Sequence, residues 1–332
     1  MRAYIIRRLF IGVFILFLLS LAVFTMLRIA PGDPAIAQCG LRCTPELIEA
    51  NRELLGMNHP YFPVSVDLTG PSFISINAAS QYGNWIGDVV TGDLGDASFT
   101  RRPVIDSLVQ RLPVTIELLV ITLLITATVG ISFGIISALF RNSPADYIAR
   151  VTAVLGLSVP NFWIATMVLL IPLALWGYAP PLGSAVDFFD DPVGNLLQFV
   201  PPAAVLGLAS AAGIMRLTRS SLLEVLRADY VRTARAKGLR ERVVVGRHAL
   251  RNSLIPVVTV LGLQVAALMG GTVIIEQIFA LPGLGRYFFQ SLVTRDFTVV
   301  QSLTLYIGVI VVLMNLLVDI SYAWLDPRIR YQ

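Results

Sequence analysis

Charged side chains are scarce in this chain of 332 residues. Asp, Glu, Lys and Arg together make up 14% of it, whereas an average soluble domain carries roughly 25%. Hydrophobic residues account for 56% of the sequence, and its mean hydropathy is +0.75. This balance excludes an ordinary soluble domain and predicts an integral membrane protein.

Lysine and histidine are also rare, and their scarcity excludes several chemistries. Lys237 is the only lysine and stands in Ala236-Lys237-Gly238, so the G-x-x-x-x-G-K-[ST] loop that binds nucleotide phosphates is absent. If ATP drives this protein, ATP and Mg²⁺ are bound by a partner and this chain binds no cofactor. His59 and His248 are expected on opposite sides of the membrane, and no metal site is predicted.

Cysteine is limited to Cys39 and Cys43, which form a C-x3-C pair without a nearby histidine. In an oxidising compartment outside the cytoplasm the two thiols can form a disulfide. Two free thiols are the alternative, and a metal-binding pair is less favoured.

Six hydrophobic runs approach the length of about 20 apolar residues that a membrane-spanning helix needs. They are Leu9–Leu27, Leu118–Phe140, Val151–Trp176, Phe199–Met215, Leu254–Ile275 and Val300–Trp324. The expected fold is all-α, a polytopic membrane protein with six transmembrane helices. The first run has 19 residues, which exceeds the apolar stretch of a secretory signal peptide, so this run is expected to stay as a membrane helix.

The basic residues predict the orientation, because Lys and Arg concentrate in the cytoplasmic loops of membrane proteins. With the N-terminus inside, 17 of the 25 basic residues lie in cytoplasmic segments, so both termini are expected in the cytoplasm. The chain then divides into four parts. These are residues 1–29, a short tail and the first helix; 30–113, an outer segment; 114–325, a five-helix core with a cytoplasmic loop at 216–253; and 326–332, a cytoplasmic tail.

The cytoplasmic loop reads as a helix, a turn and a second helix. Asp229 is a plausible N-cap, and Gly238 is a plausible helix-ending glycine in the left-handed conformation. A short second helix over Glu241–Arg251 is expected before Pro256 enters the fifth span. So long and basic a loop is not needed to reverse a chain, and we interpret it as a surface for another protein.

Gly130-Ile131-Ser132-Phe133-Gly134 matches two motifs. As G-x-S-x-G it resembles a nucleophile elbow, which requires a strand-to-helix turn and Asp and His partners. As G-x-x-x-G it lets two membrane helices approach closely. Because the motif lies inside a predicted membrane helix, we assign Gly130 and Gly134 to helix packing.

Asp319 is an acid well inside a predicted span, and Asn315 lies one turn away on the same face. Such a residue is a functional candidate by default. Its position near the cytoplasmic end favours a structural pair with Asn315 over a proton or ion relay.

Four further positions interrupt or end the apolar spans. Pro160 and Asn161 in the third span and Gln264 in the fifth are helix-breaking or polar, and Glu276 ends the fifth span. These residues either line a solute path or form hydrogen bonds between helices, and Glu276 could simply mark the membrane interface. The sequence does not decide between these roles.

Ordered blocks along the chain resemble the permease subunits of bacterial ABC importers, in the dipeptide and oligopeptide branch. The blocks are PGDPA (31–35), GDLG (92–95), RLPVTIELL (111–119), SVPNFW (158–163), RLTRSSLLEVLRADYVRTARAKGL (216–239), RHALRNSLIPVVT (247–259), EQIFALPGLGR (276–286) and DISYAWLDPRIR (319–330). Where the broader family has Glu-Ala-Ala ahead of the loop glycine, this chain has Arg232-Thr233-Ala234. The stretch Pro63–Tyr82 and the cysteine pair depart from the pattern.

The resemblance implies a type I importer permease fold and a set of partners. These are a second homologous permease subunit, two ATPase subunits, an extracytoplasmic substrate-binding protein and the lipid membrane; no nucleic acid is implied. It also implies a coupling helix that docks into a groove on an ATPase, with the small Ala234 facing that groove. The coupling residues are Asp229, Tyr230, Val231, Arg232, Thr233, Ala234, Arg235, Ala236, Lys237, Gly238 and Leu239.

The expected function is therefore the membrane subunit of an ATP-driven importer for peptides or similar small solutes, which itself performs no bond chemistry. The alternative is an ion-coupled secondary transporter, which needs charged groups at the membrane midplane. A membrane enzyme is a further alternative, but the sequence offers no catalytic set. Relatives of such permeases carry dipeptides, longer peptides, glutathione and nickel complexes, so the solute stays open.

Overall fold

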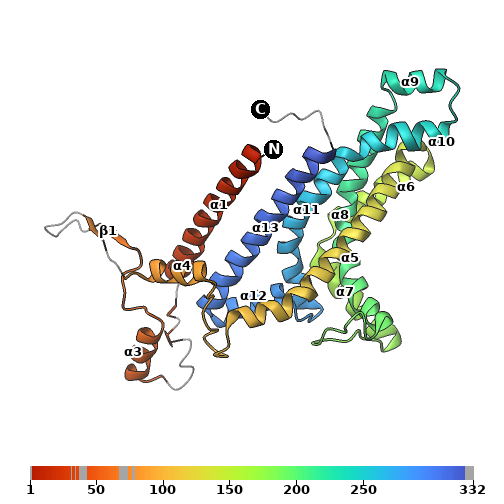
Figure 1. Ribbon diagram of the computed structural model, residues 1–332. Helices are drawn as coiled ribbons and strands as arrows, with labels where there is room; N and C mark the ends of the chain where they lie inside the picture. The colour runs from red at the N-terminus through yellow and green to blue at the C-terminus, as the bar shows by residue number, and fades with distance from the viewer. Residues whose placement is uncertain are drawn as a thin grey trace. The chain divides into compact units, whose positions relative to one another are not determined.

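The protein is almost entirely helical (Figure 1). The computed structural model describes residues 2–30, 32–33, 35–36, 43–66, 74–76 and 79–325. The chain divides into two compact units. We call Pro113–Arg286, with Met1–Ile5 and Val311–Gln332, the core unit, and Ile6–Leu112 with Tyr287–Ile310 the second unit.

Within the described residues, five helices are long and apolar enough to cross a membrane, which places the chain among multi-pass membrane proteins. They cover Ile5–Ile29, Val104–Leu139, Pro192–Val225, Glu241–Ile278 and Phe297–Asp319. The count reaches six only if the bent pair Pro144–Gly156 and Asn161–Trp176 forms one span.

The third predicted span is therefore not one straight helix. Its two halves meet at an angle of 96°, and Val159 between them is extended, with φ −95° and ψ 129°. Pro160 explains the break, because a proline disfavours helical geometry in the residue before it and cannot donate a backbone hydrogen bond.

The core unit is built from helices of very different lengths. They are α5 (Val104–Leu139), α6 (Pro144–Ser158), α7 (Asn161–Trp176), α8 (Pro192–Val225), α9 (Asp229–Ala236), α10 (Glu241–Val243), the π-helix η2 (Val244–Leu250) and α11 (Arg251–Ile278). Helix α8 packs against α6, α7 and α11. Figure 1 shows α9 and α10 beyond one end of α8 and α11, with α7 toward the other end.

Glycine lets α5 and α8 approach closely, as the G-x-x-x-G spacing predicts. A Cβ atom on Gly130 would lie 2.8 Å from Ile214 Cβ, and one on Gly134 would lie 2.5 Å from Thr218 Cβ. Ser132, between the two glycines, is exposed and helical. The strand-to-helix turn of a nucleophile elbow is therefore not present at this serine.

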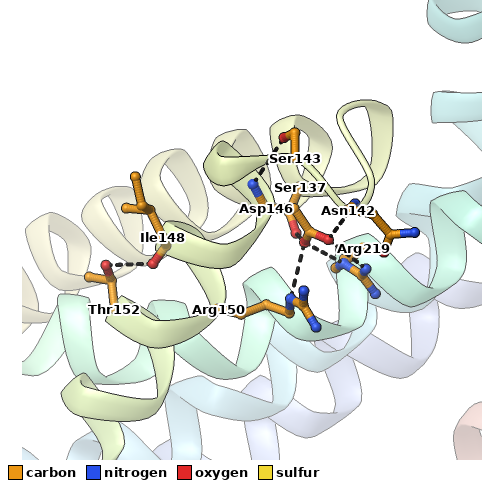
Figure 2. A network of polar contacts seen from close by, with 8 residues as sticks. All are labelled: Ser137, Asn142, Ser143, Asp146, Ile148, Arg150, Thr152 and Arg219. Carbon is orange, nitrogen blue, oxygen red and sulfur yellow. Dashed lines mark hydrogen bonds and ion pairs between the residues drawn. The ribbon is translucent and has the colours of Figure 1, made fainter.

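A buried carboxylate ties α5, α6 and α8 together (Figure 2). Asp146 of α6 has no exposed surface, and its two carboxylate oxygens accept bonds from Arg219 Nε and Nη2 of α8, at 3.0 and 3.1 Å. Ser137 Oγ of α5 and the Asn142 backbone N–H donate to the same carboxylate. Arg150 Nε lies 3.3 Å from it. The carboxylate is thus surrounded by donors from both flanking helices.

The second unit contains α1 (Arg2–Ile29), α3 (Pro45–Leu54), β1 (Val64–Val66), β2 (Ile74–Ile76), α4 (Gln81–Thr91), α12 (Leu284–Thr294) and α13 (Phe297–Leu325), although α13 continues into the core unit. Strands β1 and β2 pair antiparallel, with Val64 opposite Ile76. Aromatic rings of Phe24, Tyr82 and Trp85 pack together, with centroids 5.3 to 6.1 Å apart. This ring cluster joins α1 to α4.

The GDLG turn of this unit is held against the start of α13. Ser302 Oγ donates to the Leu94 carbonyl at 2.9 Å, and Asp296 accepts from the Ser98 backbone N–H at 2.8 Å. Asp296 is buried, and this burial raises the pKa of its carboxyl group. The turn thus has a fixed position at the end of the outer segment.

Replacing Gly134 with leucine should prevent the close approach of α5 and α8. We expect Gly134→Leu to destabilise the protein by about 1–3 kcal/mol or to abolish its assembly, because the larger side chain cannot fit beside Thr218. Thermal unfolding and size-exclusion chromatography of the purified protein measure both effects. Ser132→Ala is the matched control and should behave as wild type; loss of activity in a well-assembled Ser132→Ala protein would revive the nucleophile hypothesis.

Replacing Asp146 with alanine should leave the positive charge of Arg219 without its partner. Removing one member of a buried ion pair typically costs about 3–5 kcal/mol. Because Arg219 is partly exposed, we expect the lower end of that range, seen as a lower unfolding temperature. Asp190→Ala, at an exposed carboxylate, should change stability by less than about 0.5 kcal/mol. Equal effects of the two substitutions would contradict this account.

Candidate functional site

The candidate coupling helix α9 has eight residues, Asp229–Ala236. Its N-cap is Ala228, which provides no side-chain hydrogen bond, so the prediction that Asp229 caps the helix is wrong. Asp229 is instead the first helical residue, and its carboxylate lies 3.0 Å from Arg232 Nη2 one turn later. An acid in the first turn still interacts favourably with the helix dipole.

Helix α9 ends where the sequence predicts. Gly238 has φ +77°, in the left-handed region that other residues enter only at a cost. Its N–H donates to the Arg235 carbonyl at 2.9 Å, and the Leu239 N–H donates to the Ala234 carbonyl at 3.4 Å. This pair of bonds is a Schellman motif, which reverses the chain directly after the helix.

One face of α9 is buried within the chain itself. Val231 and Val244 have no exposed surface, Ala234 is 7% exposed, and all three pack together against Val225 and Leu226. The prediction that Ala234 faces a partner's groove is therefore wrong. A small residue is needed at this position because the helix lies close to the base of its own loop.

The side chains that a partner can reach lie beside this buried face, on α9 and on the turn that follows it. Tyr230 is 44% exposed and Leu239 is 41% exposed, while Arg232 and Lys237 are also at the surface. The orientation of the Tyr230 side chain is stabilised by Asn252, whose Nδ2 atom donates a hydrogen bond to the Tyr230 hydroxyl group at 2.9 Å. The exposed surface thus combines two apolar side chains with positive charge.

An ion pair closes the loop beside this surface. Arg235 Nη2 lies 2.7 Å from Glu241 Oε1, and Arg235 Nε donates to the second oxygen at 3.1 Å. The hydrogen bond to Glu241 raises the pKa of Arg235, so the guanidinium stays charged. Because both side chains are largely exposed, the pair contributes at most about 1 kcal/mol.

The second half of the loop is not a separate short helix. Residues Glu241–Ile278 form one continuous helical run, in which Val244–Leu250 adopts the wider π-helical geometry. The prediction of a short helix that ends at Arg251 is therefore wrong, and Pro256 lies inside α11. Membrane helices tolerate an internal proline, because neighbouring groups satisfy the carbonyl that it leaves unbonded.

The base of the loop is attached to the helices below it. Ala138 of α5, Leu222 of α8 and Ala249 of η2 form one buried cluster. The ion pair between Asp146 of α6 and Arg219 of α8 connects α6 to one of these helices (Figure 2). Asp146 is not among the residues predicted from the sequence. The signal that indicates it is Ser143-Pro144-Ala145-Asp146, a typical helix start, in which Ser143 Oγ accepts a hydrogen bond from the Asp146 N–H at 3.4 Å.

Glu276 is not a surface residue of an open path. Its carboxylate is fully buried and accepts bonds from Thr115 Oγ1 at 2.8 Å and from the Arg286 backbone N–H at 3.0 Å. Thr115 Oγ1 in turn accepts the Leu284 N–H at 2.9 Å. Glu276 therefore holds the Pro-Gly-Leu-Gly turn onto α5, and its assignment to a solute path is wrong.

The other predicted path residues are not brought together with Glu276. Pro160 and Asn161 are exposed at the start of α7, and Gln264 is half-buried in α11. The Gln264 Oε1 atom is buried and has no hydrogen-bond donor among the described residues. A cavity of about 460 Å³ between α5, α6, α7 and α8 is apolar and lined by none of these residues.

The roles predicted for the pair Asn315 and Asp319 and for the pair Cys39 and Cys43 stay predictions. Asp319 and Asn315 are partly buried in α13, and the role of their pair is not settled by their positions. Cys39 lies outside the described residues, so the predicted disulfide with Cys43 cannot be placed.

The chain matches two protein families that describe parts of one type of protein. Residues 130–331 match "Binding-protein-dependent transport system inner membrane component". Residues 1–119 match the N-terminal region, "Binding-prot-dependent transport system membrane comp, N-term". Membership implies a membrane location and partners that bind substrate and hydrolyse ATP.

Similar proteins have the same length and related names. A putative peptide transport system permease protein of Brucella abortus is 39% identical over 331 residues, which covers 100% of both chains. The dipeptide transport system permease protein DppB of Alkalihalophilus pseudofirmus and the oligopeptide transport system permease protein AppB of Bacillus subtilis are each 37% identical, with 100% of each chain covered.

Solved structures confirm the fold. The MetNI methionine ABC transporter, in an inward-facing conformation, contains a chain that aligns with a TM-score of 0.55 at 16% identity, covering 67% of this chain and 97% of that one. An amino acid ABC transporter aligns with a TM-score of 0.53 at 14% identity, covering 66% and 94%. With relatives similar over its whole length and a matching fold, the chain belongs to the family of binding-protein-dependent transport system inner membrane components.

Proposed function

We propose that this chain is one of two homologous permease subunits of an ATP-driven importer, and that it forms half of the path for peptides or similar small solutes. Two ATPase subunits bind ATP and Mg²⁺ and perform the hydrolysis, and an extracytoplasmic protein delivers the solute. The chain itself makes and breaks no covalent bond. The peptide assignment is supported by relatives that are named for peptide, dipeptide and oligopeptide transport.

The observation that carries the proposal is the two-sided helix α9. One face of this helix is buried against Val244 and the end of α8, whereas Tyr230 on the helix and Leu239 just after it are exposed beside basic residues. A solvated connector needs no buried face, and a buried helix needs no exposed aromatic residue. This combination suits a rigid helix that is fixed to its own chain on one side and contacted by a partner protein through its exposed side chains.

The packing of the loop indicates how movement reaches the membrane helices. Helix α9 follows α8 directly, and its residue Val231 packs against Val225 and Leu226 at the end of α8. Below it, Ala138, Leu222 and Ala249 join α5, α8 and η2. When the ATPase pair closes and displaces α9, these helices move with it, which supports alternating access.

The orientation is part of the proposal: α9 and both termini lie in the cytoplasm. In a variant without Cys39 and Cys43, we expect Lys237→Cys to react with a membrane-impermeant maleimide only after cell lysis. Asp190→Cys, at an exposed position in the outer loop, should react in intact cells. Reaction of Lys237→Cys in intact cells would reverse the topology and remove α9 from any cytoplasmic ATPase.

The coupling role predicts that Leu239→Asp weakens ATPase binding by at least about tenfold, because an exposed apolar contact is replaced by a charge. Tyr230→Ala should weaken binding too, whereas Tyr230→Phe removes the hydrogen bond with Asn252 but keeps the ring. Pull-down of the ATPase and ATP-dependent uptake in reconstituted vesicles measure the effects.

Leu182→Asp is the matched control, since this leucine is 53% exposed in the outer loop. It should leave ATPase binding unchanged. Normal binding and uptake in Leu239→Asp and Tyr230→Ala would show that the loop is only a connector. Uptake that continues without ATP hydrolysis and stops when the proton gradient is dissipated would favour the ion-coupled alternative.

A further inference from the structure

A polar cavity of about 400 Å³ lies within the second unit, between the end of α1 and the starts of α4 and α13. Its volume falls in the range of roughly 300–1,000 Å³ that is typical of small-ligand sites. Polar side chains of its lining include Arg28, Asn58, Gln81, Ser98 and Gln301. None of these residues has a role in the coupling site.

Arg28 is held rigidly at this cavity. Its guanidinium carbon lies 3.7 Å from the centre of the Phe24 ring, so one face of the group is stacked. Nε and Nη2 are each 3.4 Å from Gln81 Oε1, and Nη1 donates to Gln301 Oε1. Both glutamines are buried.

The glutamine that orients Arg28 is itself fixed. The Gln81 amide nitrogen donates to the Met57 carbonyl at 3.1 Å and to the His59 carbonyl at 2.8 Å. These two bonds leave the Gln81 oxygen directed at Arg28. The guanidinium is therefore in place before any ligand arrives, which lowers the entropic cost of binding one.

Arg28 has no carboxylate partner in the described part of the chain. The other arginine at the cavity, Arg52, is paired with Asp33 at 2.7 Å. Two amide oxygens accept hydrogen bonds from Arg28 but do not neutralise its charge. Three of its five N–H donors have acceptors, and the remaining two match the planar, two-pronged geometry of a carboxylate.

A second unpaired donor lies close by. Trp85 and Arg28 both line an adjoining cavity of about 210 Å³, which shares Gln81 and Gln301 with the first. The indole N–H of Trp85 is buried and finds no acceptor among the described residues. A buried donor without an acceptor is costly, so an incoming acceptor gains from pairing with it.

The acidic residues around the two cavities limit which classes of ligand can bind there. Asp33 lines the larger cavity, and the exposed residues Asp88 and Asp93 line the smaller one. They repel a multiply charged phosphate more than a carboxylate, and they can attract a ligand's ammonium group. A short zwitterionic molecule, with one carboxylate and one amine, matches this distribution of charge.

We propose that these joined cavities bind the free carboxylate of a small zwitterionic ligand on Arg28, and that the ligand is a short peptide. Only the identification of the ligand as a peptide rests on the function proposed above. Arg28 thus adds a solute contact at the end of the first membrane helix, within the second unit.

The test uses the purified importer complex without its solute-binding protein and labelled Ala-Phe as the probe. Equilibrium binding should be at least about tenfold tighter for Ala-Phe than for its C-terminal amide, because the amide lacks the charge that Arg28 recognises. Arg28→Gln should weaken Ala-Phe binding by a similar factor and remove the preference over the amide. Arg28→Lys should retain part of that preference.

Two further variants keep the test decisive. Asn58→Asp places a negative charge at the exposed rim of the cavity without touching the contacts of Arg28, and it should weaken Ala-Phe binding several-fold. Arg102→Gln removes an exposed arginine of the same unit that lines neither cavity, and it should bind as wild type.

Equal binding of the peptide and its amide, or unchanged binding in Arg28→Gln and Asn58→Asp, would overturn the carboxylate site. ATPase pull-down and ATP-driven uptake are measured on the same preparations. If pull-down and uptake fail while the preference for the free carboxylate persists, the importer assignment is wrong and the carboxylate site stands. If pull-down and uptake succeed without that preference, the carboxylate site is wrong and the importer assignment stands.

Discussion

The buried carboxylate of Asp146 is the interaction on which the half of the core unit nearest to α9 depends. An isolated carboxylate without exposed surface would be strongly destabilising, since its desolvation costs several kcal/mol. The two bonds from Arg219, with donors from Ser137 and the Asn142 backbone, compensate for that loss only in one arrangement of α5, α6 and α8. The network (Figure 2) therefore specifies geometry more than it adds stability.

The position of the loop that contains α9 depends on this arrangement of α5, α6 and α8. Helix α8 carries Arg219 and continues to α9, and Ala138 of α5 packs with Ala249 of η2. The glycine contact between α5 and α8 brings the two backbones close enough for these short side chains to meet. Without the close approach, Val231 and Ala234 would have no fixed base to pack against, and α9 could not act as a rigid element.

Sequence patterns predicted the features that depend on local chemistry. The lengths of the hydrophobic runs predicted five of the membrane helices. The G-x-x-x-G spacing predicted a close helix contact, which α5 makes with α8. Gly238 predicted the left-handed turn that ends α9. Each of these follows from the residues within one or two helical turns. The family resemblance added the importer assignment, because the shape of the loop does not by itself identify a partner.

The predictions that failed depend on contacts between distant segments. A small residue such as Ala234 suits a partner's groove and a tight internal contact equally well, and only the position of Val244 decides. Glu276 reads as a surface acid at the end of a span until Thr115 and Arg286, far away in the sequence, are seen to bind it. The cavity at Arg28 does not follow from the sequence for the same reason, since its residues come from five separate stretches of the chain.

The buried carboxylates of Glu276 and Asp146, from two different helices, are bound by side chains of one and the same helix. Both of these side chains belong to α5, Thr115 bound to Glu276 and Ser137 bound to Asp146. Thr115 and Ser137 are 22 positions apart. At 1.5 Å per residue this is roughly 33 Å along the helix, close to the thickness of a bilayer's hydrocarbon core of about 30 Å. The polar contacts thus lie about one membrane thickness apart, and Gly130 and Gly134 pack against α8 between them.

This spacing has a mechanical consequence. Hydrogen bonds to charged groups are strong where water is scarce, so each end of α5 is fixed to its neighbours, while the apolar middle is held only by close packing. A displacement applied near Asp146 is then carried along α5 to the turn that Glu276 holds, instead of being lost in local rearrangement. The alternating access that we propose requires such a connection, because each half of the path has to open toward one membrane face at a time.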